Sequence, residues 1–374
     1  MTRSFRSPPD TLLRALATAP RPTGSAALAA ARDRCAGELR SLGFEVREAP
    51  FAFSAFPGRF ATPLFGGAAV FLVGLAGMYG SGGFRWPPVL ILALGGLGAW
   101  LVGTWLSKHG VLTAPLLREE GVNLEASRPG ETPALWLCAH LDSKSQPVPT
   151  LARSSGIVLE GAGFAMMLVV ATIAAAGGDP AAMYWVCAGF LTLLGGIPVM
   201  LSMVGTRSPG ALDNASGVVT MLAVAQELVA VPRVGVLITD AEELGMAGAR
   251  AWVRGGKWGG ATVLNCDGVD DEGRIAVMFT GARPRALLGA VSRASSATGV
   301  PHVAMRMVPG VLTDSVAFAD AGLPSVTFMR GSVRSLLRVH RAGDDLAHLR
   351  GTGIADTALL IAATVRALTN RETG

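Results

Sequence analysis

Charged residues, cysteine and tyrosine are scarce in this sequence of 374 residues, and the shortage of charge is unusual for a soluble globular protein. Only 16% of the residues are charged, whereas about a quarter is usual, and half are apolar, which points to membrane segments. The net charge is +5, but the sequence has no Arg/Lys run with interleaved aromatic residues. The excess of positive charge therefore indicates a protein close to a membrane and argues against a nucleic-acid partner.

The four cysteines form no Cys-x-x-Cys motif and no obvious pair. Cys138 and Cys266 lie in apolar, strand-like runs, and Cys187 lies in a membrane-like run. Free thiols in such runs fit a reducing compartment. Residues 1–24 contain arginines but no apolar run, so we expect no cleavable secretory signal.

Four long runs are nearly free of charge, and each is close to the ~20 residues that a membrane-spanning helix needs. Residues 81–88 join the first two runs and residues 178–180 join the second two, so we expect two helical hairpins. Glu160 is the one charged residue inside a run. Buried core helices are the alternative, because glycine and alanine dilute the apolar signal. The predicted spans are residues 62–80, 89–107, 156–177 and 181–205.

Each hairpin returns the chain to the side that it left, so the remaining segments face one compartment. The flanks of the hairpins carry six basic residues, whereas their tips carry only Arg85. Basic flanks favour the cytoplasmic side, so we expect an integral membrane protein of about four spans with its soluble part in the cytoplasm. The predicted soluble domain is made of residues 1–61, 108–155 and 206–374, with hairpins at 62–107 and 156–205.

Outside the hairpins, strands and helices alternate. Apolar residues at helical spacing predict helices between Asp10 and Leu42, and Phe44–Glu48 alternates like a strand. The alternation argues for a layered α/β fold with a mainly parallel sheet. Further strands are expected at residues 134–139, 234–239, 261–266, 275–279 and 324–329, and helices at 216–229, 241–253, 285–297 and 353–368.

Side chains that can bind metal follow several of these strands. In open α/β sheets, ligands bind beyond the carboxyl ends of the strands. An ordered set of His, Asp, Glu, Asp and His at such positions is what a two-metal hydrolytic site needs. The predicted ligands are His140, Asp213, Glu243, Asp267 and His340, with Asp142 and Glu242 beside them.

Each of these residues has a separate role in the hypothesis. Asp213, on a turn-rich stretch, would bridge two zinc ions, and zinc accepts imidazole and carboxylate ligands. His140 and Glu243 would complete one metal shell. Asp267 and His340 would complete the other.

The two neighbouring carboxylates would support this site. Asp142 would accept the imidazole N–H of His140 and fix its tautomer. Glu242 would take a proton from the activated water and pass it to the leaving amine. Taken singly, such residues also occur at helix caps, at helix starts, in turns and as surface histidines. The prediction therefore depends on their order and on their occurrence together.

The motifs around these residues resemble metallopeptidase family 28, the di-zinc exopeptidases that include bacterial secreted aminopeptidases and glutamate carboxypeptidase. The resemblance covers roughly residues 8–55, 120–155 and 206–370. The motifs that carry it are Ala139–Ser143, Pro209–Gly217, Ala241–Gly245, Asn265–Asp267, Val339–His340 and the segment Thr313–Pro324.

The resemblance implies a doubly wound mixed sheet flanked by helices, into which the two membrane hairpins are inserted. It also implies two zinc ions, and it gives the five ligands, the base Glu242 and the supporting Asp142 the roles stated above. In family members the peptide bond after the bridging aspartate is commonly cis, so we expect a cis bond between Asp213 and Asn214.

The sequence departs from the family at two places. The final His-Thr-Pro-x-Asp motif is reduced to His340 and Asp344, with other residues between them. Several family members use a tyrosine to steady the oxyanion, but the two tyrosines here lie in membrane-like runs. The substitute donors or substrate contacts that we expect are Arg341, Thr313 and Ser315.

The resulting hypothesis is a membrane-anchored zinc exopeptidase, first of all an aminopeptidase, which hydrolyses a peptide or small amide with a water activated by two metals. A single-zinc aminoacyl cyclase or amidohydrolase of the same fold is one alternative. A non-catalytic, receptor-like relative is another, and it would be indicated by loss of ligands. The sequence leaves the substrate, the oligomeric state and the native metal open.

Overall fold

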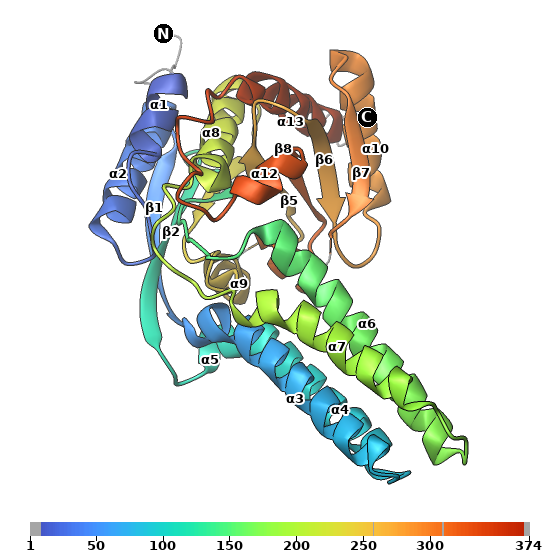
Figure 1. Ribbon diagram of the computed structural model, residues 1–374. Coiled ribbons are helices and arrows are strands. Elements are labelled where there is room, and N and C mark those ends of the chain that lie inside the picture. Colours follow the sequence, from blue (N-terminus) through green and yellow to red (C-terminus); the bar gives the residue numbers. More distant parts are fainter. Residues whose placement is uncertain (1–8, 257, 309, 370–374) are drawn as a thin grey trace.

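An eight-stranded mixed sheet forms the centre of the computed structural model, which describes residues 9–256, 258–308 and 310–369. The strand order is β1-β2-β4-β3-β5-β8-β6-β7, and helices cover both faces (Figure 1). This architecture confirms the predicted fold class. The strands are β1 (Glu45–Ser54), β2 (Arg118–Ser127), β3 (Leu135–His140), β4 (Val234–Thr239), β5 (Thr262–Val269), β6 (Arg274–Phe279), β7 (His302–Arg306) and β8 (Ser325–Gly331).

The middle of the sheet is parallel. Strands β4, β3, β5 and β8 pair in parallel, and every residue of β3 and β4 is buried. Such strands have apolar neighbours on both faces, which explains their continuous apolar sequence. Because parallel strands end at the same edge, the residues that follow β3, β4 and β5 come together there. Strands β2 and β6 are antiparallel to their neighbours β4 and β8.

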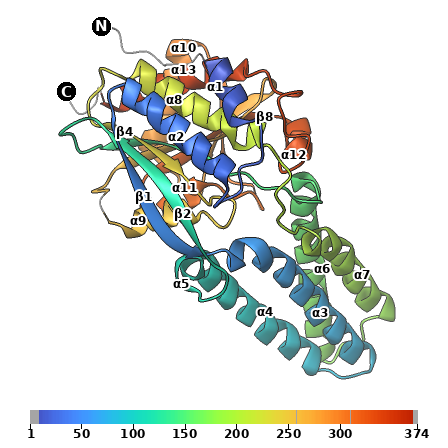
Figure 2. The ribbon, with the colours of Figure 1, turned by 90° about the vertical axis from the view of Figure 1, so that its left-hand side faces the viewer.

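Two helical layers enclose the sheet. One layer packs α1, α2, α8, α10 and α13 on one face, and the other packs α9 and α11 on the opposite face (Figure 2). Each layer buries apolar side chains against the strands. The helices of this body are α1 (Pro9–Leu16), α2 (Ala26–Ser41), α5 (Val111–Thr113), α8 (Gly217–Glu227), α9 (Ala247–Arg254), α10 (Arg285–Thr298), α11 (Asp314–Asp320), α12 (Val333–Arg338) and α13 (Gly353–Thr369).

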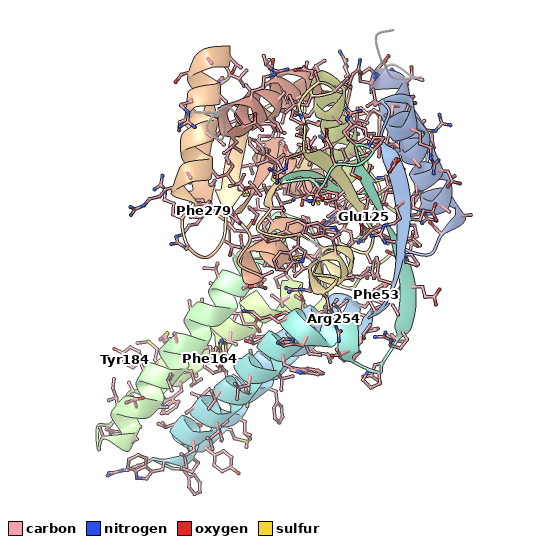
Figure 3. All side chains as sticks on the ribbon, turned by 180° about the vertical axis from the view of Figure 1, so that it is seen from behind. Phe53, Glu125, Phe164, Tyr184, Arg254 and Phe279 are labelled. Carbon is pink, nitrogen blue, oxygen red and sulfur yellow. The ribbon has the colours of Figure 1, made fainter. Side chains whose placement is uncertain are left out.

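Four long helices project from the body as an arm (Figures 1 and 2). They are α3 (Thr62–Ser81), α4 (Pro87–Trp105), α6 (Thr150–Ala175) and α7 (Ala182–Met200). With their short extensions, all four are long and apolar enough to cross a membrane by length and composition. Large apolar side chains point outward along the arm (Figure 3), which is typical of a surface that lipid covers.

Close contacts between small residues hold the arm together. A Cβ atom on Gly195 would lie 2.4 Å from the backbone nitrogen of Glu160, so only glycine allows α7 to approach α6 this closely. A Cβ atom on Gly163 would likewise meet Thr192 at 2.4 Å. Membrane helices associate through such small residues, because apolar burial gives little net gain in lipid.

The structure corrects one predicted helix and adds elements that the sequence pattern did not predict. The helix expected at residues 241–253 begins only at Ala247, because residues 241–246 form a turn with φ of 56° at Ala241 and 59° at Met246. Strands β2 and β7 and helix α12 were not expected, since each is short in apolar residues or interrupted by charge. The strand expected at residues 44–48 extends to Ser54.

Helices of the arm begin and end close to the expected spans, although α6 starts at Thr150, before the predicted residue 156. Residues 1–8 and 370–374, at the two ends of the predicted soluble domain, lie outside the described residues. All four cysteines are free, as expected. Three are buried, whereas Cys187 is exposed on α7.

Candidate metal centre

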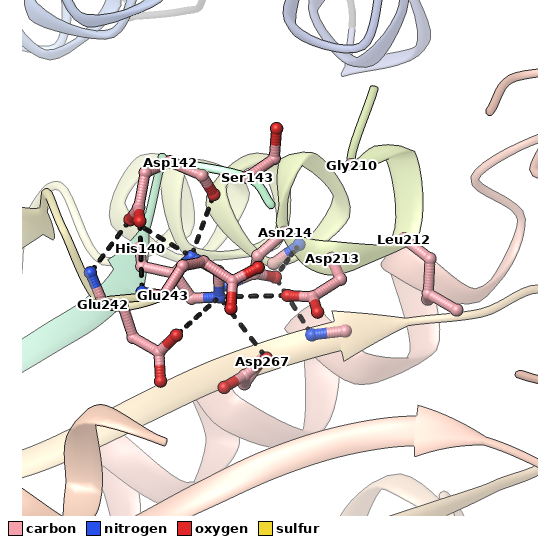
Figure 4. Close-up of polar contacts among 12 residues, drawn as sticks. His140, Asp142, Ser143, Gly210, Leu212, Asp213, Asn214, Glu242, Glu243 and Asp267 are labelled. Atoms are coloured by element: carbon pink, nitrogen blue, oxygen red, sulfur yellow. Dashed lines mark hydrogen bonds and ion pairs between the residues drawn. The ribbon is translucent and has the colours of Figure 1, made fainter. Parts of the chain in front are cut away.

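The five predicted ligands converge at the carboxyl edge of the parallel strands, and all are at least nine-tenths buried. His140 ends β3, Glu243 follows β4, and Asp267 lies near the end of β5 (Figure 4). Asp213 lies in a non-helical turn, within Ala211–Ser216, that leads into α8. His340 follows α12 and has φ of 63°, a left-handed conformation that few non-glycine residues adopt.

These side chains form two groups that share one carboxylate. In the first group, His140 Nε2 lies 3.1 Å from Asp213 Oδ1 and 3.6 Å from Asp267 Oδ1. In the second, His340 Nε2 lies 2.9 Å from Asp213 Oδ2 and 3.4 Å from Glu243 Oε2. Within each group the ligand atoms lie within 4.8 Å of one another. Asp213 therefore directs one oxygen to each group, as a bridging ligand must.

The grouping differs from the expected one. The sequence hypothesis paired His140 with Glu243 and Asp267 with His340. In the structure, His140 shares its group with Asp267, and Glu243 shares its group with His340. Strand β3 lies between β4 and β5, so the grouping depends on where the side chains end: Asp267 Oδ1 lies 3.6 Å from His140 Nε2, whereas Glu243 Oε2 lies 3.4 Å from His340 Nε2.

Both groups fit a metal ion. The Nε2 atom of His140 is buried and has no hydrogen-bond partner within the described part of the chain. Three buried carboxylates also need positive charge nearby, because an uncompensated buried charge is unfavourable. Imidazole nitrogen with carboxylate oxygen is a donor set that suits zinc.

The protonation equilibria reflect this crowding of charge. Burial alone would raise the pKa of Asp213, but the adjacent imidazoles of His140 and His340 hold it well below its usual value. Burial alone would lower the pKa of His340, but the charge of Glu243 raises it. Burial raises the pKa of Asp267. A site with these preferences favours bound cations, whether protons or metal ions.

Asp142 positions the turn that carries the two glutamates. Its Oδ1 atom accepts the backbone N–H of Glu242 and its Oδ2 atom accepts that of Glu243, both at 3.1 Å (Figure 4). These bonds hold the turn at residues 241–246, where the positive φ values of Ala241 and Met246 are not helical. Asp142 was expected to accept the imidazole N–H of His140; its Oδ1 lies 3.5 Å from Nδ1, and its backbone oxygen lies closer, at 3.1 Å.

Asn214 fixes the turn after the shared carboxylate. The Asp213–Asn214 peptide bond is cis, which confirms the expectation drawn from the resemblance. The side chain of Asn214 donates to the carbonyl oxygen of Cys266 at 2.9 Å and accepts the backbone N–H of Gly268 at 2.9 Å. The turn that carries Asp213 is thereby attached to the strand that carries Asp267.

Asp344, the second residue kept from the family's final motif, holds the same turn from the other side. Its carboxylate accepts the backbone N–H of Leu212 at 2.7 Å and that of Asp213 at 3.1 Å. Burial raises the pKa of Asp344 to about 7. The two surviving residues of the motif, His340 and Asp344, thus both contact the bridging residue or its turn.

Two residues near the centre were not predicted from the sequence. Arg21 is 1% exposed and donates to the carbonyl oxygens of Leu141 at 2.8 Å and Gly210 at 3.0 Å, so it joins the two loops that carry His140 and Asp213. Nothing in the local sequence marks this arginine, because its partners are far along the chain.

Lys144 is the second unpredicted residue. Its Nζ atom lies 2.7 Å from Oε2 of Glu243, within the second ligand group. Although burial alone would lower it, the charge of Glu243 raises the pKa of Lys144. Burial alone would raise the pKa of Glu243, but Lys144 lowers it to about 2. Its position two residues after Asp142 is the one signal that could have identified it.

The three expected substrate contacts lie in different places. Thr313 lines the cavity beside the centre, and its hydroxyl bonds those of Ser315 and Thr327. Ser315 is buried in this hydroxyl cluster and does not line the cavity. Arg341 donates to the carbonyl oxygen of Pro147 at 3.2 Å and is not among the described residues that line the cavity.

Comparisons with known proteins agree with this geometry. Residues 199–365 match the model of peptidase family M28. The fold is similar to that of an aminopeptidase from Aneurinibacillus sp. strain AM-1 (TM-score 0.56, 12% identity, covering 96% of this chain and 92% of the other). It is also similar to BSAP, a zinc aminopeptidase from Bacillus subtilis (TM-score 0.56, 15% identity, 96% and 93% covered).

A third similar structure is named for a different reaction. It is a glutaminyl cyclase from Bacteroides thetaiotaomicron (TM-score 0.54, 13% identity, covering 96% of each chain). A search of curated proteins found no match. At such identities the solved structures establish the fold alone. The recognition made from the sequence is confirmed: this chain carries a peptidase family M28 region at residues 199–365, on a mixed α/β fold shared with zinc aminopeptidases.

Proposed function

We propose that this protein is a membrane-anchored, zinc-dependent exopeptidase, in the first instance an aminopeptidase. The observation that carries the proposal is the Asp213 carboxylate, whose two oxygens face two separate ligand groups. When bound there, two zinc ions would polarise the scissile carbonyl and make an attacking water more acidic. The first ion would be held by His140, Asp213 and Asp267, and the second by Asp213, Glu243 and His340.

Glu242 is the residue that would move the proton. It lines the cavity beside the centre but belongs to neither ligand group, and its Oε2 atom lies 3.9 Å from Nε2 of His140. Burial raises the pKa of Glu242 well above its ordinary value, which suits a group that both accepts and returns a proton near neutral pH. Asp142 keeps it in place through the backbone.

Arg153 is the cation best placed to contact the substrate. It lines the cavity, and its guanidinium is held by Oε1 of Gln146 at 2.7 Å and the carbonyl oxygen of Gly310 at 2.9 Å. Arg341, the donor proposed from the sequence, instead bonds a backbone carbonyl. Both tyrosines lie on the arm, on α3 and α7, away from the cavity lining. Arg153 therefore replaces Arg341 in the proposal as the donor or carboxylate clamp.

The membrane location is part of the proposal. We place the body in the cytoplasm and only residues 81–88 and 178–180 on the other side, since the flanks of the arm are basic. A membrane-impermeant thiol reagent applied outside intact cells should label a cysteine introduced at Arg85 and spare one at Glu227 in a Cys187→Ala background. The reverse pattern would invert the orientation.

A single-zinc cyclase or amidohydrolase is the second candidate, and Lys144 favours it. Its ammonium lies 2.7 Å from Glu243, so it supplies positive charge where the second ion would bind. A non-catalytic relative is less well supported, because all five predicted ligands are present and assembled. Zinc counted per chain distinguishes these candidates, with two ions expected for the exopeptidase and one for the cyclase.

A peptide-library digest by the purified protein tests the function directly. We expect single residues to be released from one end of the peptides, and a chelator should abolish release. The digest also identifies which end is attacked. Release of internal fragments, or release that a chelator leaves unchanged, would contradict the proposal.

A further inference from the structure

The cavity at the metal centre continues into the arm. It has a volume of about 780 Å³, within the ~300–1,000 Å³ range of small-molecule sites. At one end it is lined by Asp213, Glu242, Glu243 and His340. At the other end all four long helices contribute to the wall, through Phe65 of α3, Gly103 of α4, Ile157 of α6 and Val199 of α7.

The reach of the cavity can be measured along α6. The first residue of this helix, Thr150, lies beside the centre, where its Oγ1 is 3.1 Å from Nδ1 of His340. Glu160 is the residue furthest along α6 that lines the cavity. Ten residues of helix rise about 15 Å, so the apolar part extends about that far from the centre. A peptide dissolved in water does not need such an extension toward lipid.

The mouth of the cavity is also apolar. Met305, Val308 and Leu312 line it and are 37%, 40% and 60% exposed. The loop that follows β7 lies against the first turns of α6, where Gly310 accepts a hydrogen bond from Arg153. An exposed apolar rim at the body end of the arm is a surface that an amphiphile leaving the bilayer can follow.

We infer that the substrate is an amide that bears a long hydrocarbon chain and enters from the bilayer. Its scissile bond would lie at the metal centre while its chain lies between Phe65, Gly103 and Ile157. This inference names the substrate class of the proposed exopeptidase or amidohydrolase and rests on that function. Each methylene buried in the apolar part should strengthen binding about fourfold at most.

Glu160 sets the end of the apolar part. It is 7% exposed, and its Oε1 atom has no hydrogen-bond partner among the described residues. A chain that reaches this carboxyl gains nothing from burying further methylenes against it. The increase in binding strength with chain length should therefore level off in the native protein. Glu160→Leu should extend this increase to longer chains.

The test uses the full-length protein in phosphatidylcholine nanodiscs with two substrate ladders. One ladder consists of L-alanyl ethyl-, hexyl-, dodecyl- and hexadecylamides, and the other of the matching N-acyl-alanines. We expect the KM of one ladder to fall by about tenfold or more from ethyl to dodecyl, because apolar burial drives binding. A KM independent of chain length in both ladders would overturn the inference.

Two glycines of α4 provide a matched pair of variants. A Cβ on Gly103 would be 3.4 Å from Phe65, so Gly103→Leu fills the cavity without a backbone clash. Gly98 has nothing within 4 Å and does not line the cavity, so Gly98→Leu is the control. Gly103→Leu should remove most of the decrease in KM with chain length, whereas Gly98→Leu should keep it. Equal behaviour of the two variants would count against the inference.

Binding to the chelator-treated protein separates this inference from the proposed function. A dansyl-labelled dodecylamide should bind the metal-free protein, and Gly103→Leu should weaken that binding about tenfold or more. If chain binding persists while no amide is hydrolysed, the proposed function fails and the cavity assignment stands. If hydrolysis occurs but the dansyl probe does not bind, the reverse holds.

Discussion

The body and the arm use apolar side chains in opposite ways. In the body, β3 and β4 are buried along their whole length, and polar side chains gather at one edge. On the arm, Phe71 is 67% exposed and Val186 is 69% exposed. Burial from water stabilises the first arrangement, whereas in the proposed membrane location lipid would cover the exposed side chains of the second. Apolar runs in the sequence therefore become buried strands in the body and outward-facing helices on the arm.

The two regions also differ in what fixes their geometry. Long-range hydrogen bonds position the candidate metal centre in the body, such as those that Asp142 and Asp344 accept from backbone N–H groups. The arm is positioned by close approach of backbones at glycine, as at Gly195. Substitutions in the body should thus change zinc content or catalytic activity, and substitutions in the arm should change how its helices pack. The following predictions test this difference.

The largest effect is expected for Asp213→Ala. Because this carboxylate belongs to both ligand groups, its loss should remove both zinc ions and all measurable peptidase activity. Zinc per chain, measured by atomic emission after gel filtration, checks this. Asp271→Ala, which removes a carboxylate outside both groups, is the control and should keep its zinc. Near-normal zinc in Asp213→Ala would show that this residue does not bridge.

Glu242→Gln should keep its zinc and lose activity by roughly 10²–10⁴-fold, the usual contribution of a general base. The amide retains the shape of the carboxyl, so the loss should fall on kcat. Glu227→Gln on α8, far from the centre, is the matched control and should behave as wild type. Wild-type turnover by Glu242→Gln would remove it from the mechanism.

Alanine substitutions of Arg153 and Arg341 should have different kinetic effects. Arg153→Ala should lower kcat about 10²-fold with all substrates if it is a donor to the oxyanion, or mainly raise KM for carboxylate-bearing substrates if it is a clamp. Arg341→Ala should change little, because its guanidinium bonds the Pro147 carbonyl. Steady-state kinetics with neutral and acidic peptides decide between these roles. The opposite ranking of the two arginines would restore the original assignment.

The smallest effect on chemistry and the clearest effect on assembly should come from the arm. Gly195→Leu introduces a side chain where a Cβ already lies 2.4 Å from the backbone of α6, and overpacking typically costs about 1–3 kcal/mol. Gly189 on the same helix has nothing within 4 Å, so Gly189→Leu is the control. Thermal unfolding in nanodiscs should show a lower Tm for Gly195→Leu alone. An unchanged Tm would mean that α6 and α7 do not pack this way.

The sequence predicted what depends on local pattern. Strand β4 was expected at residues 234–239 and lies there, because a short apolar run between turn residues has few alternatives. The five candidate ligands come together in the structure as expected, because their motifs lie near strand ends. The helix expected from residue 241 begins only at Ala247, because Ala241 and Met246 have positive φ in a turn held by Asp142, about a hundred residues earlier.

The unpredicted parts of the site share one physical cause, which is contact between segments distant along the chain. Arg21 acts on Leu141 and Gly210, and no periodicity in its own segment indicates this. His140 groups with Asp267, and Glu243 groups with His340, which lies about a hundred residues further along the chain, so no local pattern indicates the grouping. The extension of the cavity into the arm likewise depends on how four separate helices meet.

The second hairpin, α6 and α7, lies in the chain between His140 and Asp213, two members of the same ligand group. During synthesis, His140 is therefore completed before the hairpin and Asp213 after it. The group can close only once the hairpin has folded back on itself and returned the chain to the body. In the membrane location proposed above, assembly of the candidate centre is coupled to insertion of this hairpin, and a chain that has not yet inserted it holds only His140 of the three residues in the first group.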